Sequence, residues 1–427
     1  MSTRGHTQLG VAAWGAATFA ALLASSSAIR PVRDALILDG NPDQLPWLFL
    51  ATFIAISVVS PLWSALLANR SRRGFVPLAF HAFAACAIGF FVVVAADLAP
   101  LTVGRVFYVW SAVFNLFVVS VFWSLLADLL RPGTARKLYG LIAAGGTVGT
   151  LIGPLLTGLL VGRIGVAGLL VMSAVLLELA VLLVHGLRRA AAGLADDAAP
   201  ATGEPRGTQG GGEALDTPAG GGAFTGIAHV ARSAYLSAIV GYVLCTACAA
   251  TFMYLAQARI VHDALHDRVA RTSYFASLDL WTAAATLVLQ TVVAAPALGR
   301  FGPGIVLAVL PLAQAAGISV LTAAPSLTAL AIVQVISRSA THGLTRPARE
   351  LLFTVISRDD KYRAKNAIDT IGYRLGDAAS SWLDKGLVAL SAGSGVLIGS
   401  IPVIAIWLGL AALLGVGFRR RVTKELP

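Results

Sequence analysis

Residues 164–187 read IGVAGLLVMSAVLLELAVLLVHGL, with Glu178 as the only Asp, Glu, Lys or Arg among them. About 20 helical residues cross a hydrocarbon core of about 30 Å, so this run is long enough to span a membrane. Similar runs recur along nearly the whole chain, in which 57% of residues are hydrophobic and 12% are charged. That charged share is about half the share in an ordinary globular domain. The sequence therefore predicts a polytopic membrane protein.

The apolar runs predict an all-α fold. They are continuous, whereas the strands of a membrane barrel alternate between apolar and polar residues over short segments. We predict twelve transmembrane helices in two halves of six. The approximate spans are 10–30, 45–68, 76–96, 103–130, 138–162 and 164–187 in the first half, and 233–258, 272–298, 303–322, 326–355, 363–390 and 395–418 in the second.

Loop charges predict the orientation in the membrane. If the N-terminus is cytoplasmic, most loop Lys and Arg residues fall on the cytoplasmic side, including Arg70, Arg72, Arg73 and the run Arg419-Arg420-Arg421. This is the usual bias, so we expect both termini in the cytoplasm. The net charge of +11 then follows from topology and from contact with anionic lipid. We expect the lipid bilayer as a partner, and no nucleic acid.

One long loop separates the two predicted halves. Residues 189–231 are rich in Gly, Ala, Pro and Thr, and this composition cannot build a core. We therefore predict three parts: a six-helix half at 1–188, a flexible cytoplasmic linker at 189–231, and a second six-helix half at 232–427.

The two halves share a spaced pattern. Shifting one half by 227 residues aligns Arg131, Arg136, Gly145 and Gly149 with Arg358, Arg363, Gly372 and Gly376. This alignment suggests an internal duplication, as in the parallel repeats of the major facilitator superfamily. We expect the four arginines to act in gating. The glycines, which recur every four positions with Gly153, predict close helix packing rather than a nucleotide-binding loop.

Two charged signatures interrupt the apolar sequence: Arg30-Pro31-Val32-Arg33-Asp34 and Arg346-Pro347-Ala348-Arg349-Glu350. Charge at membrane depth costs roughly 2.5–3.5 kcal/mol per residue. A guanidinium group binds phosphate or carboxylate through two parallel hydrogen bonds. We predict an outer basic rim from the first signature and a deeper anion clamp from the second. In the alternative, the arginines pair with Asp34, Glu350 or other acids and only hold helices together.

Other ionisable groups fall inside predicted spans. Asp369, Tyr373 and Asp377 step by four along one predicted helix, with Arg374 beside them, so we expect this face to line the substrate pathway. Its acids could pair with the arginines in the empty carrier and release them to an anion, or form a permanent ion-pair network.

Two more acids lie inside predicted spans. Glu178 and Asp279 could carry a coupling proton, because burial favours the protonated form of a carboxyl group. In the alternative, each pairs with a neighbouring basic or amide group. The sequence leaves both readings open.

The signatures carry a family resemblance. Residues 30–36, 346–355 and 357–365, followed by Asp369-Thr370, Tyr373-Arg374 and Gly376-Asp377, resemble the ATP/ADP translocase family of intracellular bacteria and plastids, and especially its free-living bacterial relatives. The first basic position, typically Lys in that family, is Arg30 here. The resemblance implies the major facilitator fold and membrane transport more firmly than it implies ATP as cargo.

Together these features predict a secondary transporter in a bacterial inner membrane. We expect alternating access around a basic cavity. The expected cargo is an organic anion, such as a nucleotide or another phosphorylated metabolite, and exchange is one way in which it could be moved. The alternatives are a proton-coupled transporter of a peptide, siderophore or drug, and a non-transporting membrane subunit. Nothing resembles a catalytic triad, a metal-binding helix or a Walker loop. We expect no enzyme activity, no cofactor and no metal, and a monomer.

Overall fold

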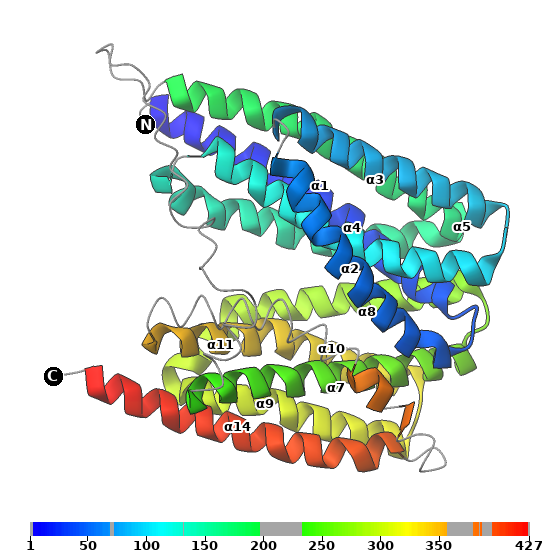
Figure 1. Cartoon of the computed structure of the whole chain (residues 1–427), viewed down its shortest axis with the longest axis vertical. Helices are drawn as coiled ribbons and strands as arrows, with labels where there is room; N and C mark the ends of the chain where they lie inside the picture. The colour runs from blue at the N-terminus through cyan, green and yellow to red at the C-terminus, as the bar shows by residue number, and fades with distance from the viewer. Residues whose placement is uncertain are drawn as a thin grey trace. The chain divides into compact units, whose positions relative to one another are not determined.

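The computed structural model describes residues 3–68, 72–130, 132–196, 233–356, 379–383, 385–386 and 395–425. Every regular element within these ranges is helical, so the predicted all-α membrane fold is confirmed (Figure 1). The longer elements are α1 (Thr3–Ile37), α2 (Leu45–Ala68), α3 (Arg72–Ala95), α4 (Pro100–Leu129), α5 (Pro132–Asp196), α7 (Ala234–Ala264), α8 (Arg268–Val288), α9 (Ala294–Ala323), α10 (Leu327–Ala340), α11 (Arg346–Leu352) and α14 (Gly395–Glu425).

Four short helical turns also lie within the described ranges. Two are 3₁₀ turns, η1 (Pro42–Gln44) and η4 (Phe353–Val355). The other two are π-helical turns, η2 (Leu289–Val293) and η3 (Thr341–Thr345), each inserted directly between two α-helices. The structure thus joins α8 to α9 through η2, and α10 to α11 through η3.

The chain forms two compact units. Unit 1 comprises Met1–Gly40, Ile54–Thr217 and Asp267–Leu280, and unit 2 comprises Asn41–Phe53, Pro218–His266 and Trp281–Pro427. The first residues of α8 therefore belong to unit 1, although the rest of that helix belongs to unit 2. Helix α5 continues through Asp196 into the predicted linker, and residues 197–231 of that linker lie outside the described part of the chain.

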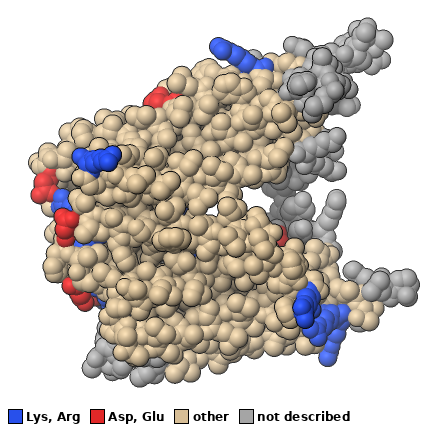
Figure 2. Space-filling model, turned by 180° about the vertical axis from the view of Figure 1, so that it is seen from behind, with Lys and Arg blue, Asp and Glu red and all other residues tan. Residues whose placement is uncertain are grey.

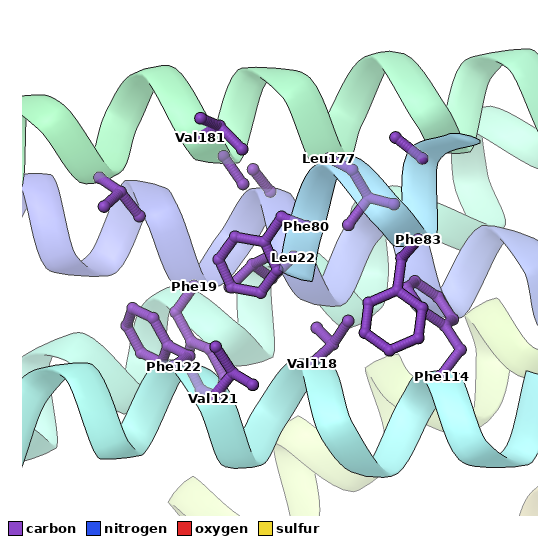
Figure 3. Close-up of a cluster of buried hydrophobic side chains, with 14 of the residues drawn as sticks. Phe19, Leu22, Phe80, Phe83, Phe114, Val118, Val121, Phe122, Leu177 and Val181 are labelled. Carbon is purple, nitrogen blue, oxygen red and sulfur yellow. The ribbon is translucent and has the colours of Figure 1, made fainter. Parts of the chain in front are cut away.

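Aromatic side chains build the core of unit 1. The rings of Phe19 and Phe122 stack with their centroids 4.7 Å apart, and those of Phe83 and Phe114 meet edge to face at 5.1 Å. Offset-stacked and edge-to-face pairs are the favoured aromatic arrangements. Figure 3 shows these rings converging with Leu22, Phe80, Val118, Val121, Leu177 and Val181 from four helices.

A glycine stripe packs α5 against α1. A Cβ atom placed on Gly145, Gly149 or Gly153 would collide with the backbone of α1, at the carbonyl oxygens of Ala16, Ala20 and Ala24. Only glycine permits such close approach of two helix backbones. The predicted close packing of this stripe is therefore confirmed.

Hydrogen-bonded aromatic and amide side chains lie in the core of unit 2. Trp407 is fully buried, and its ring centroid lies 5.7 Å from that of Tyr242. The Tyr242 hydroxyl donates to the Leu307 carbonyl at 2.8 Å, and Gln334 Nε2 donates to Gln257 Oε1 at 2.7 Å. These bonds link neighbouring helices and satisfy polar atoms that burial would otherwise penalise.

Eight helical segments in the described part of the chain are long and apolar enough to cross a membrane. Two of them, Leu138–Gly193 and Arg268–Ala323, contain 56 residues each and turn at Gly165 and Gly302, where φ is +70° and +73°. Each therefore covers two predicted spans. The predicted span 326–355 is helical but is not among the eight, and most of 363–390 lies outside the described residues. Twelve spans remain a prediction.

The surface is consistent with contact with hydrocarbon. Figure 2 shows a face that is mostly uncharged, with Lys, Arg, Asp and Glu gathered near its edges. Large apolar side chains lie exposed on the helices, for example Leu182 and Leu159 of α5 and Leu62 of α2. Because lipid tails solvate such side chains, their exposure fits a membrane protein.

Candidate functional site

The first arginine signature lies on α1 and pairs with acids. The Arg33 guanidinium contacts Asp34 through two nitrogens, Nε at 2.8 Å and Nη2 at 2.7 Å from the same oxygen. It also lies over the Tyr108 ring of α4, 5.1 Å from the centroid, which is a cation–π arrangement. Arg33 thus pairs with an acid. The sequence left this pairing open as the alternative to substrate contact.

Arg30 faces a buried acid. Its Nη1 atom lies 3.6 Å from Oδ2 of Asp279, and the side chains are 37% and 6% exposed. Asp279 belongs to the part of α8 that packs in unit 1. At 3.6 Å the two groups form an ion pair beyond hydrogen-bond distance. The pairing of Asp279 with a basic neighbour, one of its two predicted roles, is therefore present.

A second group of charges lies at the end of α1. Arg268 donates to Asp39 and to Asp97, each at 2.8 Å, and Arg271 approaches Asp39 at 3.4 Å. Burial raises the pKa of the Asp39 carboxyl above its usual value, although the two arginines oppose this shift. The sequence could not show that these residues meet, because Arg268 and Arg271 are far from Asp39 and Asp97 in the chain.

Glu178 pairs with a histidine. Its Oε1 atom lies 2.8 Å from Nδ1 of His81 on α3, and both side chains are about half exposed. A pairing with a basic neighbour was one of its two predicted roles.

The second arginine signature begins directly after the π-helical turn η3. Arg346 is the first residue of α11, and Pro347 follows it. The side chain of Arg346 is exposed, and within the described part of the chain it makes no hydrogen bond or ion pair. It lies nine residues before Val355, about 14 Å along a helix. Arg349 is half-buried and Glu350 is exposed.

Several predicted site residues cannot be placed. Arg136 lies in α5, and its side chain is not described. The others lie outside the described residues: Asp369, Tyr373, Arg374, Asp377, Arg131, Arg358 and Arg363. The predicted polar stripe and its exchange of partners with the arginines therefore stay predictions.

The described residues include exposed guanidinium groups. No group of three or more His, Cys, Asp or Glu side chains within the described ranges could hold a metal ion. Exposed guanidinium groups remain charged at any working pH and suit the planar geometry of phosphate and carboxylate. The exposed guanidinium of Arg346 has the charge and geometry to attract a phosphate or carboxylate group.

Sequence comparison finds a transporter family that matches part of the chain. Residues 274–418 match the family model of the TLC ATP/ADP transporter. The predicted resemblance is confirmed. This stretch contains the second arginine signature and both π-helical turns, whereas the first signature lies outside it. A search among curated proteins finds no match to the sequence.

Solved structures show the fold. The nucleoside transporter NupG aligns with a TM-score of 0.60 at 12% identity, covering 97% of this chain and 99% of that one. A bacterial homologue of the iron transporter ferroportin, in its inward-facing state, aligns with a TM-score of 0.60 at 13% identity, covering 99% of each chain. These transporters have the major facilitator fold. The spanning helices show a multi-pass membrane protein, and the family-model match over residues 274–418 supports a role in membrane transport.

Proposed function

We propose that the protein is a secondary transporter that moves an organic anion by alternating access to a basic cavity. The proposed cargo is a nucleotide or another phosphorylated metabolite, carried by exchange. The observation that supports the proposal most strongly is the exposed guanidinium of Arg346 inside the stretch that matches ATP/ADP transporters. Arg346 falls within the predicted span 326–355, and a charge inside a membrane span is costly, so such residues usually have a function.

The two signatures suit different steps of transport. Arg346, with Arg349 on the same short helix, binds the anion through charge-assisted hydrogen bonds. Arg30 and Arg33 form a basic rim. When no substrate is present, Asp279 pairs with Arg30 and Asp34 pairs with Arg33. An incoming phosphate competes with these carboxylates for the arginines. This competition favours exchange, because the carrier returns readily only when an anion is bound.

The cellular setting completes the proposal. We place the protein in a bacterial inner membrane, as a monomer with both termini in the cytoplasm, because loop Lys and Arg residues follow that orientation. Arg358 and Arg363, with Arg131 and Arg136, would then act at the cytoplasmic gate. The protein performs no catalysis in this proposal, and gradients of solute supply the driving force.

Exchange in proteoliposomes tests the proposal. Vesicles containing the purified protein are loaded with unlabelled ATP, ADP or no nucleotide, and uptake of labelled ATP and ADP is followed. The expected result is uptake only into loaded vesicles. Uptake should be lost in Arg346→Ala and kept in Arg300→Ala, which removes an exposed arginine that lies over the ring of Phe301. Equal uptake by Arg346→Ala and the unchanged protein would contradict the proposal.

One observation favours a second candidate, proton-coupled transport of a different solute. His81 and Glu178 form an ionisable pair within helices long enough to span a membrane. Such intramembrane pairs mark proton relays in many transporters. An imposed pH gradient discriminates the two candidates. Uptake driven by that gradient into vesicles without internal nucleotide, and its loss in Glu178→Gln, would support the second candidate.

A further inference from the structure

The two π-helical turns of unit 2 lie against each other. Gln290 Nε2 in η2 donates a hydrogen bond of 3.0 Å to the carbonyl of His342 in η3. The approach is close, because a Cβ atom placed on Gly343 would lie 2.6 Å from the Cβ of Leu289. Turns of this kind are rare and often lie at functional sites. The question is what this pair of turns does for the arginine that follows.

The backbone bonds of η3 explain why His342 accepts from a side chain. In an α-helix, the His342 carbonyl would accept from the N–H of Arg346, four residues later. Here the Arg346 N–H donates instead to the Thr341 carbonyl, five residues earlier, as in a π-helix. The next residue, Pro347, has no N–H. Neither of these residues supplies a donor to the His342 carbonyl, and Gln290 supplies one.

We propose that Gln290 is the positioning residue for Arg346. This inference rests on the proposed function, since it takes Arg346 as the group that binds the anion. Gln290 is exposed on the surface of a helical segment that is long and apolar enough to cross a membrane, and hydrocarbon offers no donor to replace one that a carbonyl loses. Without Gln290, the π-helical turn loses its advantage over an α-helical turn, which would return the Arg346 N–H to the His342 carbonyl and place the Gly343 carbonyl opposite Pro347 instead. That exchange converts the π-helical turn into an α-helical one.

The conversion changes the direction of Arg346 but not its charge. A π-helical turn holds one extra residue, and one residue corresponds to about 100° of rotation in an α-helix. Loss of the extra residue therefore rotates α11 by about 100° relative to α10. Arg346 is exposed and Thr345 is buried in the observed register. Gln290 acts on the direction of Arg346 through its hydrogen bond to the backbone carbonyl of His342.

Thiol accessibility tests the register directly. The full-length protein is prepared with Cys86, Cys245 and Cys248 replaced by Ser, and then carries either Arg346→Cys or Thr345→Cys. Labelling by a small charged thiol reagent should be fast at position 346 and slow at 345. Adding Gln290→Met removes the donor at nearly constant size and should reduce this difference at least about threefold. Unchanged labelling at both positions would overturn the proposal.

Two further variants distinguish loss of the Gln290 hydrogen bond from a general loosening of unit 2. Gln290→Glu keeps the size and polarity but cannot donate when ionised, so it should label like Gln290→Met. Gln314→Met removes another amide that donates to a backbone carbonyl in unit 2, that of Ala249, and should leave the labelling unchanged. An equal effect of Gln314→Met would assign the change to general loosening and overturn the proposal.

Transport supplies an independent readout. With Arg346 present, Gln290→Met should raise the KM for the exchanged nucleotide about tenfold, while the maximal rate changes less, because the binding group is misdirected. An unchanged KM would count against the inference. If the unchanged protein exchanges no nucleotide, the proposed function fails, yet the labelling experiment still decides whether Gln290 fixes the register of α11.

Discussion

The two arginine signatures share a sequence pattern and differ in their surroundings. In unit 1, Arg30 and Arg33 lie on an uninterrupted helix, and each pairs with an acid. In unit 2, Arg346 follows a π-helical turn, and its exposed side chain has no partner among the described residues. The Arg-Pro pattern alone therefore does not determine the role of its arginines. The neighbouring helices do so.

Proline illustrates the difference. Pro31 lies within α1, where the helix continues to Ile37. Pro347 is the second residue after the π-helical turn, and because it has no N–H it cannot donate to the His342 carbonyl, which accepts from the Gln290 amide. One proline is accommodated within a helix, whereas the other adjoins a change of helix type. We therefore expect substrate binding to depend on the second signature more than on the first.

Arginine removal should give the largest contrast. Arg346→Ala removes charged hydrogen bonds to the anion, each worth about 1.5–3 kcal/mol, and should lower kcat/KM for exchange at least about 100-fold. Arg30→Ala should lower it about tenfold, because Arg30 already shares its charge with Asp279. Initial exchange rates in proteoliposomes measure both. A larger loss in Arg30→Ala than in Arg346→Ala would reverse the assigned roles.

A single methyl group should sharpen the account of the π-helical turns. Gly343→Ala places a Cβ atom against Leu289, which pushes η2 and η3 apart and breaks the bond between Gln290 and His342. We expect KM to rise about tenfold, as in Gln290→Met. Gly299→Ala is the matched control, because a Cβ there meets no atom within 4 Å. Equal KM values for the two variants would show that the close approach is not needed.

Replacing the guanidinium group of Arg346 by the ammonium group of lysine should have a smaller effect than removing the charge. Arg346→Lys keeps the positive charge and loses the paired hydrogen bonds to phosphate, so the KM should rise about fivefold to tenfold. The same change at Arg33 should raise KM less, since Arg33 already pairs with Asp34 and lies over the Tyr108 ring. Concentration series of exchange provide both values. Identical KM shifts at the two positions would remove the distinction between the signatures.

The smallest expected effect concerns stability. Arg30→Ala deprives the buried Asp279 carboxylate of its ion-pair partner and should lower the free energy of unfolding by about 1–3 kcal/mol. Asp279→Asn should lower it by less than about 1 kcal/mol, because Arg30 is more than one-third exposed and stays solvated. Thermal unfolding in detergent compares the two variants. Equal melting temperatures would contradict this asymmetry.

The sequence predicts the fold well, because the apolar runs must form helices in lipid. Residues 164–187 lie within α5, and the Gly145, Gly149 and Gly153 stripe packs against α1 as its spacing indicates. Long apolar runs determine where helices form, and regularly spaced small residues determine where helices pack closely. Both patterns can be read from neighbouring positions in the sequence. The resemblance read from residues near Arg346 is likewise confirmed over residues 274–418.

The candidate site could be predicted only in part. Arg346 stands out as a charge in an apolar sequence, but a π-helical turn adds one residue to a helix, and the apolar pattern around 341–345 does not reveal it. The pairs Arg30–Asp279 and Arg268–Asp39 join residues more than 200 positions apart, and only the folded chain brings them together. The role of Gln290 depends on the same long-range contact with η3.

Ligand-induced stabilisation tests the central claim most directly. The purified protein, Arg346→Ala and Arg300→Ala are heated with a panel of nucleotides, sugar phosphates, carboxylates and neutral solutes, and the melting temperature is recorded. A ligand that binds only the folded state raises it. We predict that at least one phosphorylated compound raises the melting temperature of the unchanged protein and of Arg300→Ala, but not of Arg346→Ala. An equal rise in Arg346→Ala, or a response to neutral solutes only, would contradict an anion site at Arg346.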